Sequence, residues 1–291
     1  MLDVRSVLLL VLAILAAGFG IVIARGAARR RAGDPARPGP LLLAIGFVTD
    51  FFDTLGIGSF APTTTIFRLT GLVPDRLVPG TLNAGHAVPS IVQALIFIAI
   101  VDVEAPTLLA MLLAAVTGGW LGAGMVARWP RRRIQAGMGV ALLVAATFML
   151  LTNLGWLPAG GDALGLDGPR LVIATVANGL LGALMTLGIG LYAPCMILVS
   201  LLGMSPLAAF PIMMGSCAML MPFAGTRFIA AGAWDVRATI GLTLGGIPGV
   251  LVAAFVVRSL PLAAVRWLVV GVVVYTAVGL LRAVARADTD A

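Results

Sequence analysis

The chain has 291 residues, of which 60% are hydrophobic and only 11% are charged. Soluble domains carry about 25% charged residues, so this composition excludes an ordinary soluble globule and indicates an all-α, polytopic membrane protein. The net charge is +7 and all 19 basic residues are arginines, which excludes lysine chemistry such as a Schiff base. The arginines form short clusters between apolar runs, as loop charges of membrane proteins do. We therefore expect a lipid bilayer and no nucleic acid as partner.

The first apolar run covers residues 4–24 and is long enough to span a bilayer, which takes about 20 residues. It is too long for the core of a signal peptide, and its basic cluster follows the run instead of preceding it. Arginines and prolines then fill residues 25–40, which the positive-inside rule places in the cytoplasm. Residues 1–39 are thus predicted to form an additional N-terminal transmembrane helix with a basic cytoplasmic loop.

An internal repeat determines the predicted architecture of the remainder. Thr-Leu-Gly-Ile-Gly at 54–58 recurs at 186–190, and the same displacement carries Pro62 onto Pro194. The predicted divisions are a first repeat at 40–151, a Gly-, Pro- and Asp-rich periplasmic linker loop at 152–169, a second repeat at 170–285 and a cytoplasmic tail at 286–291.

Each repeat has four apolar segments, and the first segment of each is interrupted. The breaking residues are Gly56, Gly58, Pro62, Gly188, Gly190 and Pro194. Each half of a broken segment is too short to cross a bilayer, so the segment is either one long kinked helix or a re-entrant hairpin. If segment 41–70 crossed fully, the four arginines of loop 128–133 would lie outside, against the positive-inside rule.

We therefore predict two re-entrant hairpins and seven spans, with the N-terminus periplasmic and the C-terminus cytoplasmic. Each repeat then holds three full spans, and this odd number inverts the second repeat relative to the first. Inverted repeats with broken helices are typical of secondary transporters, which bind their substrate at the midplane.

The broken segments carry the predicted binding site. Pro62 and Pro194 suit the first turn of a helix, so each half-helix would present its positive N-terminus near the bilayer centre. Two such termini would converge on one spot, which suits a small anion. The plainer alternative is that these residues only kink packed helices. The predicted anion-binding residues are Thr63, Thr64, Thr65, Asn83, His86, Cys195 and Met196.

Two acids and a histidine are the predicted proton-coupling groups. Asp50 and Asp53 lie in the first broken segment, on one helix face, and carboxylates within a membrane are costly and usually functional. The second repeat has Leu184 and Met185 in this region, an asymmetry that favours coupling, with structural pairing to an arginine as the alternative. His86 either relays a proton and binds the anion when charged, or is an interhelical hydrogen-bonding group.

Other patterns suggest packing and not catalysis. Gly-Gly-x-x-Gly at 118–122 and at 245–249 predicts two close-packing helix faces. The two glycines at 56 and 58 do not open a βαβ unit and are not a nucleotide fingerprint. The sequence has no zinc-protease, Walker or Cys–His metal spacing, so we expect no enzyme, no metal and no cofactor.

The sequence resembles the sulfite exporter TauE/SafE family over residues 40–285. The resemblance rests on the duplicated Gly-rich break followed by proline, on Pro-Gly-Thr-Leu-Asn at 79–83, and on Asp-Val before the third span of both repeats. Ser59 and Leu191 stand where the family often has a third glycine.

The resemblance implies a transporter that moves sulfite, an organosulfonate or a related small anion across the bacterial inner membrane. We expect a proton-coupled exporter, with a channel-like, uncoupled anion facilitator as the alternative. A membrane enzyme or an assembly factor is the third class, which the missing catalytic motifs and the inverted repeat disfavour. A homodimer stays open.

Overall fold

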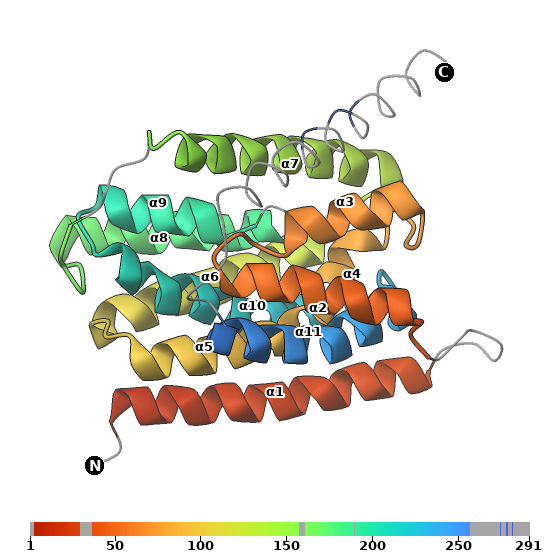
Figure 1. The fold of residues 1–291 in the computed structure, drawn as a ribbon, viewed down its shortest axis with the longest axis horizontal. Coiled ribbons are helices and arrows are strands. Elements are labelled where there is room, and N and C mark those ends of the chain that lie inside the picture. The colour runs from red at the N-terminus through yellow and green to blue at the C-terminus, as the bar shows by residue number, and fades with distance from the viewer. Residues whose placement is uncertain are drawn as a thin grey trace.

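The computed structural model describes residues 3–29, 37–156, 161–188 and 190–256, together with positions 274, 278 and 281. Every regular element of this described part is a helix, apart from one isolated bridge between Ala163 and Met204. The predicted all-α class is therefore confirmed. The long helices lie side by side in one bundle (Figure 1).

The helices follow the apolar segments and start where proline allows a start. Pro40, Pro79, Pro106 and Pro169 each stand at the first or second helical position, where the missing N–H leaves no hydrogen bond unmade. In chain order the elements are α1 (Val4–Ala28), α2 (Pro40–Thr54), α3 (Phe60–Thr70), α4 (Val78–Gly85), α5 (Ala87–Ile100), α6 (Ala105–Val126), α7 (Arg131–Asn153), α8 (Gly168–Met185), α9 (Tyr192–Leu201), the 3₁₀ turn η1 (Pro206–Ala208), α10 (Ala209–Ala230) and α11 (Val236–Val256).

Six helices of the described part are long and apolar enough to span a membrane: Val4–Ala28, Val78–Ile100, Ala105–Val126, Gly168–Met185, Pro206–Ala230 and Val236–Phe255. Five of them coincide with predicted spans. The sixth, α8, belongs to a broken segment and is longer than the half-helix we expected. The predicted span at 134–151 lies in α7, which begins with three arginines and is not among the six. The predicted span at 262–284 falls outside the described residues.

Contacts between loops define the two ends of the bundle. At one end, which we call the linker end, Arg5 pairs with Asp102, and the Ser205 amide donates to the Ala163 carbonyl at 2.8 Å. At the other end, which we call the basic end, Asp75 accepts hydrogen bonds from Arg68 and from Gln135, both at 2.7 Å. The full-length helices run from one of these ends to the other (Figure 1).

Both broken segments turn back to the end from which they start. The α2 start packs beside Gly241 at the basic end, and α3 returns there, since Arg68 near its C-terminus bonds Asp75. The α8 start follows Leu166 at the linker end, and the turn after α9 returns there, where the Gly161 amide donates to the Met204 carbonyl at 3.0 Å. The described residues thus show two hairpins that enter from opposite ends, not two long kinked helices (Figure 1).

The turns of the two hairpins require glycine. Gly56 and Gly58 have φ angles of 83° and 90°, and Gly188 has a φ of 98°. Side chains disfavour this left-handed region, whereas glycine enters it freely. Glycine also ends both returning arms, because Gly71 and Gly203 have φ angles of 65° and 93°. The repeated glycines therefore mark the same two bends in both hairpins.

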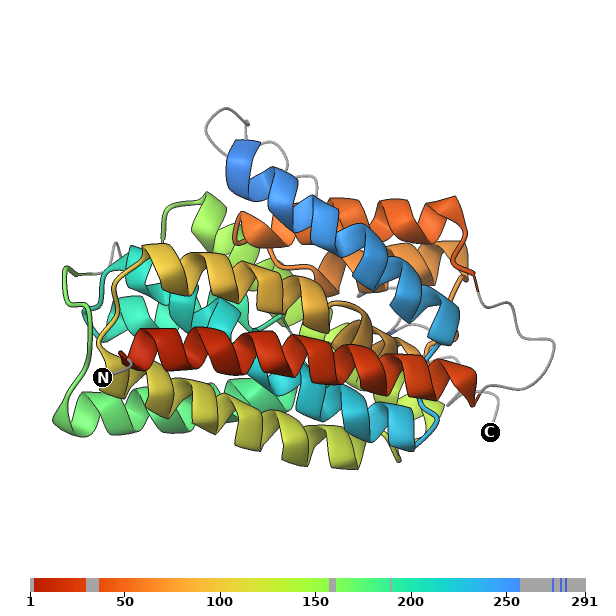
Figure 2. The ribbon, with the colours of Figure 1, turned by 90° about the horizontal axis from the view of Figure 1, so that it is seen from below.

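Small residues bring the two halves of the chain into close contact, as the glycine clusters predicted. Helix α11 packs on α2, and added Cβ atoms on Gly245 and Gly249 would overlap the carbonyls of Leu43 and Phe47. Reciprocally, α6 packs on α8, where a Cβ on Gly118 would overlap the α8 backbone. In the second view α11 crosses the bundle obliquely (Figure 2).

This packing is reciprocal, because the first segment of each predicted repeat contacts the third segment of the other. The inverted repeat itself stays a prediction, since its last segment lies outside the described residues. Helix α1 packs against α5 and α10, on the outside of this arrangement.

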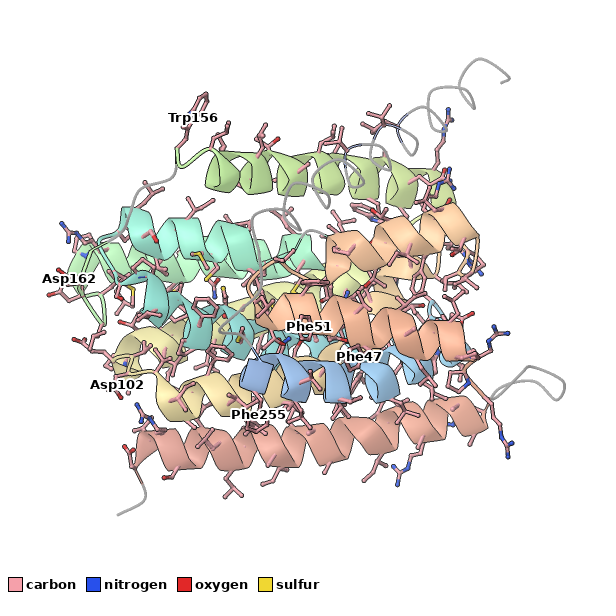
Figure 3. All side chains as sticks on the ribbon, in the orientation of Figure 1. Phe47, Phe51, Asp102, Trp156, Asp162 and Phe255 are labelled. Atoms are coloured by element: carbon pink, nitrogen blue, oxygen red, sulfur yellow. The ribbon has the colours of Figure 1, made fainter. Side chains whose placement is uncertain are left out.

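Large apolar side chains cover much of the outer surface. The exposed fractions of Phe255 and Trp156 are 86% and 74%, and Leu10 and Ile14 of α1 are also exposed. Figure 3 shows Trp156 projecting from the bundle beyond the end of α7. Such a surface suits contact with lipid acyl chains, whereas soluble proteins bury side chains of this size.

Candidate functional site

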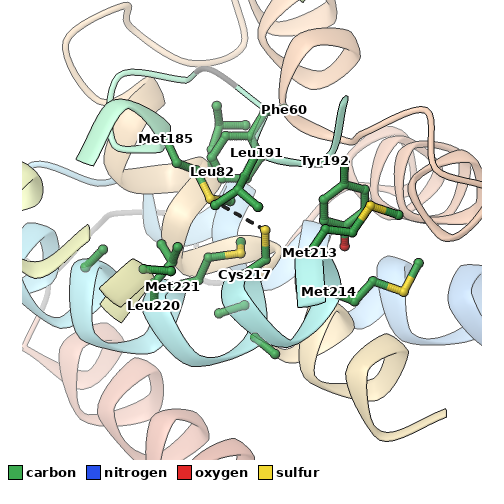
Figure 4. Close-up of a cluster of buried hydrophobic side chains, with 14 of the residues drawn as sticks. Phe60, Leu82, Met185, Leu191, Tyr192, Met213, Met214, Cys217, Leu220 and Met221 are labelled. Atoms are coloured by element: carbon green, nitrogen blue, oxygen red, sulfur yellow. Dashed lines mark hydrogen bonds between the residues drawn. The ribbon is translucent and has the colours of Figure 1, made fainter. Parts of the chain in front are cut away.

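The tips of the two hairpins meet at a small cavity. Helix α3 starts at Phe60 after Ser59, and α9 starts at Tyr192 after Leu191. The lining residues are Asp53, Gly58, Ser59, Phe60, Ser90, Met185, Gly190, Leu191, Tyr192, Cys217 and Met221. The apolar members of this group gather around Cys217 (Figure 4). The free space of about 10 Å³ is enough for one water molecule.

The half-helices α3 and α9 begin three residues before Thr63 and Cys195, the first predicted anion-binding residue on each. Pro62 and Pro194 are the third residues of α3 and α9, a place still within the first turn, where an N–H has no intrahelical acceptor. The Thr63 and Cys195 amides already donate to the carbonyls of Ser59 and Leu191, at 3.0 and 2.9 Å.

The donors without an intrahelical acceptor therefore lie at the helix starts themselves. By position they are the amides of residues 60 and 61 in α3 and of residues 192 and 193 in α9. They belong to the same turns as the cavity-lining residues Phe60 and Tyr192. The predicted anion-binding residues Thr63 and Cys195 thus lie about one helical turn beyond the helix starts.

The predicted threonine, cysteine and methionine ligands sit behind these starts. Thr63, Thr64 and Thr65 are buried, and the hydroxyls of Thr64 and Thr65 have no hydrogen-bond partner in the described part of the chain. Cys195 is buried and Met196 is half-buried. None of these five side chains lines the cavity.

Asp50, His86 and Thr63 form a buried chain of hydrogen bonds between the first hairpin and the α4–α5 junction. His86 Nδ1 lies 2.9 Å from each carboxyl oxygen of Asp50, and His86 Nε2 lies 3.1 Å from the Thr63 hydroxyl. All three side chains are fully buried. Asp50 thus pairs with a histidine, whereas the sequence analysis had considered an arginine as its partner.

Asn83 lies on the same helical stretch as His86 but does not reach the cavity. Its amide Nδ2 donates to the Pro79 carbonyl at 2.8 Å, one turn earlier in α4. Its Oδ1 is buried and accepts no hydrogen bond from the described residues. Asn83 therefore has an unused acceptor within the protein interior.

Asp53 lines the cavity and forms a second buried chain. Gln93 of α5 donates to Asp53 Oδ2 at 2.9 Å and to the Thr54 hydroxyl at 3.0 Å. Tyr192 of α9 donates its hydroxyl to Gln93 Oε1 at 2.6 Å. The hydroxyls of Ser59 and Tyr192 also interact with the Asp53 carboxyl. This chain links the acid of the first hairpin to the start of the second.

Sequence reasoning did not assign Tyr192, Ser59, Cys217 or Met221 to the site. Tyr192 was visible in the repeat, because the displacement of 132 residues that pairs Pro62 with Pro194 also pairs Phe60 with Tyr192. The two positions differ by one hydroxyl group, and that hydroxyl makes the bond to Gln93. The contacts of Cys217 and Met221, both on α10, carried no comparable signal.

Helix N-termini, a carboxyl group and apolar side chains thus meet at the point where both hairpins turn.

Comparison with known families finds a match to the model described as Sulfite exporter TauE/SafE, over residues 1–149. The matched region includes helix α1, which the sequence analysis had left outside the resemblance. No curated protein and no solved structure matches the chain. Because the matched region covers half of the chain, the protein belongs to the sulfite exporter TauE/SafE family of membrane transporters.

Proposed function

We propose that this protein is a proton-coupled secondary transporter that exports a small anion, such as sulfite or an organosulfonate. Membership of the family makes it a membrane transporter of the sulfite or sulfonate type. The anion would bind between the starts of α3 and α9, with Thr63–65, Asn83 and His86 behind it. The protein would lie in a bacterial inner membrane. Its basic end would face the cytoplasm, because the positive-inside rule places arginine-rich loops on that side.

One observation carries this proposal: two helix N-termini that come from opposite ends of the bundle meet at one cavity. Each terminus supplies about half a positive charge together with free amide donors. In a low-dielectric interior such fixed dipoles act more strongly than they do in water. They bind an oxyanion without a buried arginine, whose own desolvation would be costly.

The cavity is smaller than a sulfite ion, so binding requires lining side chains to move. Met185 and Met221 line it, and methionine is unbranched and adapts readily to a new shape. Tyr192 stands at the start of a ten-residue arm, α9, and moves with that arm.

Asp53 provides the reason to expect proton coupling. An ionised carboxyl at the cavity wall would repel the anion, whereas a protonated one would not and could donate a hydrogen bond to it. Anion binding therefore favours proton binding at Asp53, and by reciprocity a proton at Asp53 favours the anion. Asp50 and His86 lie behind it as a second pair that can exchange a proton.

Flux measurements in proteoliposomes test the proposal. Methanesulfonate is the better probe beside sulfite, because its single charge does not change with pH. A pH gradient should drive its accumulation on the alkaline side, and Asp53→Asn should abolish that accumulation while downhill flux continues. Asp102→Asn, which removes an exposed carboxyl at the linker end, is the matched control. Downhill flux without any response to pH would establish the uncoupled facilitator, and no flux of either anion would refute transport.

A further inference from the structure

This inference rests on the proposed function and deepens it. We propose that Tyr192 is a positioning residue: an anion entering the cavity takes the Tyr192 hydroxyl from Gln93, and the released amide turns and makes Asp53 take up a proton. The proton comes from the aqueous phase to which the cavity is then open. In this proposal, proton uptake by Asp53 depends on the position of α9 through the hydrogen bond between Tyr192 and Gln93.

Four hydrogen bonds fix the orientation of Gln93, the longest of them from Nε2 to the Asp50 carbonyl at 3.5 Å. Its Oε1 accepts from Tyr192 at 2.6 Å, and its Nε2 donates to Asp53 Oδ2 at 2.9 Å and to Thr54 at 3.0 Å. Gln93 is completely buried, and the exposed fractions of Asp53 and Tyr192 are 3% and 4%. Both amide hydrogens have partners, so turning the amide by half a rotation would break every one of these bonds.

This orientation determines which form of Asp53 is stabilised. An N–H directed at Oδ2 stabilises the ionised carboxyl, because a carboxylate accepts and does not donate. If the amide turned, its Oε1 would face Asp53 and would require a proton on that oxygen. The same glutamine therefore stabilises the carboxylate in one orientation and the carboxylic acid in the other.

Among the described residues, only Tyr192 connects Gln93 to the second hairpin by a hydrogen bond. Gln93, Thr54 and Asp53 all belong to the first half of the chain, whereas Tyr192 begins α9 and lines the cavity. Its hydroxyl can donate one hydrogen bond at a time. An anion between the helix starts would compete with Gln93 for that proton, and the arm would move to make room. Phe60, the equivalent residue of the first hairpin, has no hydroxyl and cannot take the same part.

Several other groups face Asp53 and also affect its affinity for a proton. They are Asp50 on α2, His86 at the α4–α5 junction, Ser59 before α3 and Cys217 on α10. Of these, only Asp50 bonds Gln93, and it does so through its backbone carbonyl, which accepts from Nε2 at 3.5 Å. Removing the Tyr192 hydroxyl frees the amide from its donor and also removes the direct interaction of that hydroxyl with the Asp53 carboxyl, so a second variant at Gln93 is needed to separate the two effects.

The test compares Tyr192→Phe with the wild-type protein in methanesulfonate-loaded proteoliposomes. With one proton per anion, a pH difference of one unit supports about tenfold accumulation in the wild type. Tyr192→Phe should reduce this final accumulation ratio to below about threefold, and the ratio reports coupling independently of the rate of transport. Thr107→Val is the matched control, since it removes one buried hydroxyl that bonds Leu166 at the linker end.

A double-mutant cycle provides the second readout. Gln93→Met keeps the length of the side chain and removes both ends of the bridge. If the two residues act through one another, the double variant should accumulate no less anion than the weaker single variant. Accumulation by Tyr192→Phe within twofold of the wild type, or losses that add in the double variant, would overturn the inference. A wild-type protein that ignores the pH gradient would instead refute the proposed function, so the two failures are distinguishable.

Discussion

The pairing of Asp50 with His86 depends on a glycine of the neighbouring helix, and this makes it open to a sharp test. Gly246 of α11 faces Asp50, and an added Cβ would overlap Oδ2 and stand 2.9 Å from the carboxyl carbon. It would also lie 2.6 Å from the ring of Pro89, which cannot rotate away. Ordinary contacts begin at 3.4 Å. Gly246→Ala must therefore displace the carboxyl carbon by about half an ångström and Oδ2 by more.

This displacement would disrupt the hydrogen bonds between the Asp50 carboxyl and His86. Both Asp50 oxygens lie 2.9 Å from His86 Nδ1, and a charge-assisted bond of this kind contributes about 1.5–3 kcal/mol. Its loss would lower the population of the paired state by about one to two orders of magnitude. If the pair exchanges the coupled proton, pH-driven methanesulfonate accumulation should fall by at least fivefold.

Two controls separate this effect from damage to the fold. Gly245→Ala disturbs the same α2–α11 contact, at the Leu43 carbonyl, and does not touch Asp50. Gly20→Ala in α1 has open space around it. We expect Gly246→Ala to lose pH-driven accumulation. Its unfolding midpoint, measured in detergent, should be no lower than that of Gly245→Ala. Normal accumulation by a folded Gly246→Ala protein would show that the Asp50–His86 pair has no part in coupling.

Three further predictions address the site, the topology and the basic end. Thr64→Val should leave anion affinity unchanged, because the buried Thr64 hydroxyl has no hydrogen-bond partner among the described residues and lies behind the helix starts; a loss of affinity in equilibrium binding would place the anion at the threonines. In a variant without native cysteines, a cysteine at Arg133 should react only with reagent from the cytoplasmic side and one at Asp162 only from the periplasmic side; the reverse would invert the proposed orientation. Asp75→Ala removes the acceptor of Arg68 and should lower the free energy of unfolding by about 1–3 kcal/mol, measured by denaturant titration; an unchanged midpoint would show that the basic end adds no stability.

The sequence was sufficient for features that depend on local patterns or on duplication. Glycines at matched positions predicted the two hairpin turns, because only glycine enters the left-handed region without strain. The Gly-Gly-x-x-Gly patterns predicted two close-packing helix faces, and the structure supplies their partners, α8 and α2. The exact helix starts were missed, since a proline fits every position of a first turn and Pro62 does not say which one it occupies.

The contacts across the cavity could not be predicted in the same way. Tyr192 and Gln93 stand 99 residues apart, on helices of different halves, and their bond exists only because the hairpin tips meet. A glutamine in an apolar helix needs some polar partner, but its sequence does not say which. Likewise, the sequence placed Asp50 in the membrane but did not identify its partner, for which an arginine was the alternative considered. The packing of α2 against the α4–α5 junction selects His86.

The charge carried by the substrate should decide the direction of transport if one proton travels with each anion. A sulfonate has a single negative charge, so it crosses with its proton as a neutral pair, and only the pH gradient acts on it. Sulfite at alkaline pH is a dianion and retains one net negative charge. An interior-negative potential of 100 mV favours its export by about 2.3 kcal/mol, whereas an exterior more acidic by one pH unit opposes export by about 1.4 kcal/mol.

Export of the dianion therefore prevails under these conditions, whereas a sulfonate is exported only when its own outward concentration gradient exceeds the opposing pH gradient. In proteoliposomes with an imposed potassium-diffusion potential, sulfite flux at alkaline pH should follow the voltage, and methanesulfonate flux should be indifferent to it. The Asp53→Asn variant should lose this distinction, because an asparagine carries no proton and both anions would then cross with their full charge. Methanesulfonate flux that follows the voltage in the wild type would mean that no proton accompanies the anion. The carboxyl group of Asp53 would then belong to the structure of the cavity and not to its transport cycle.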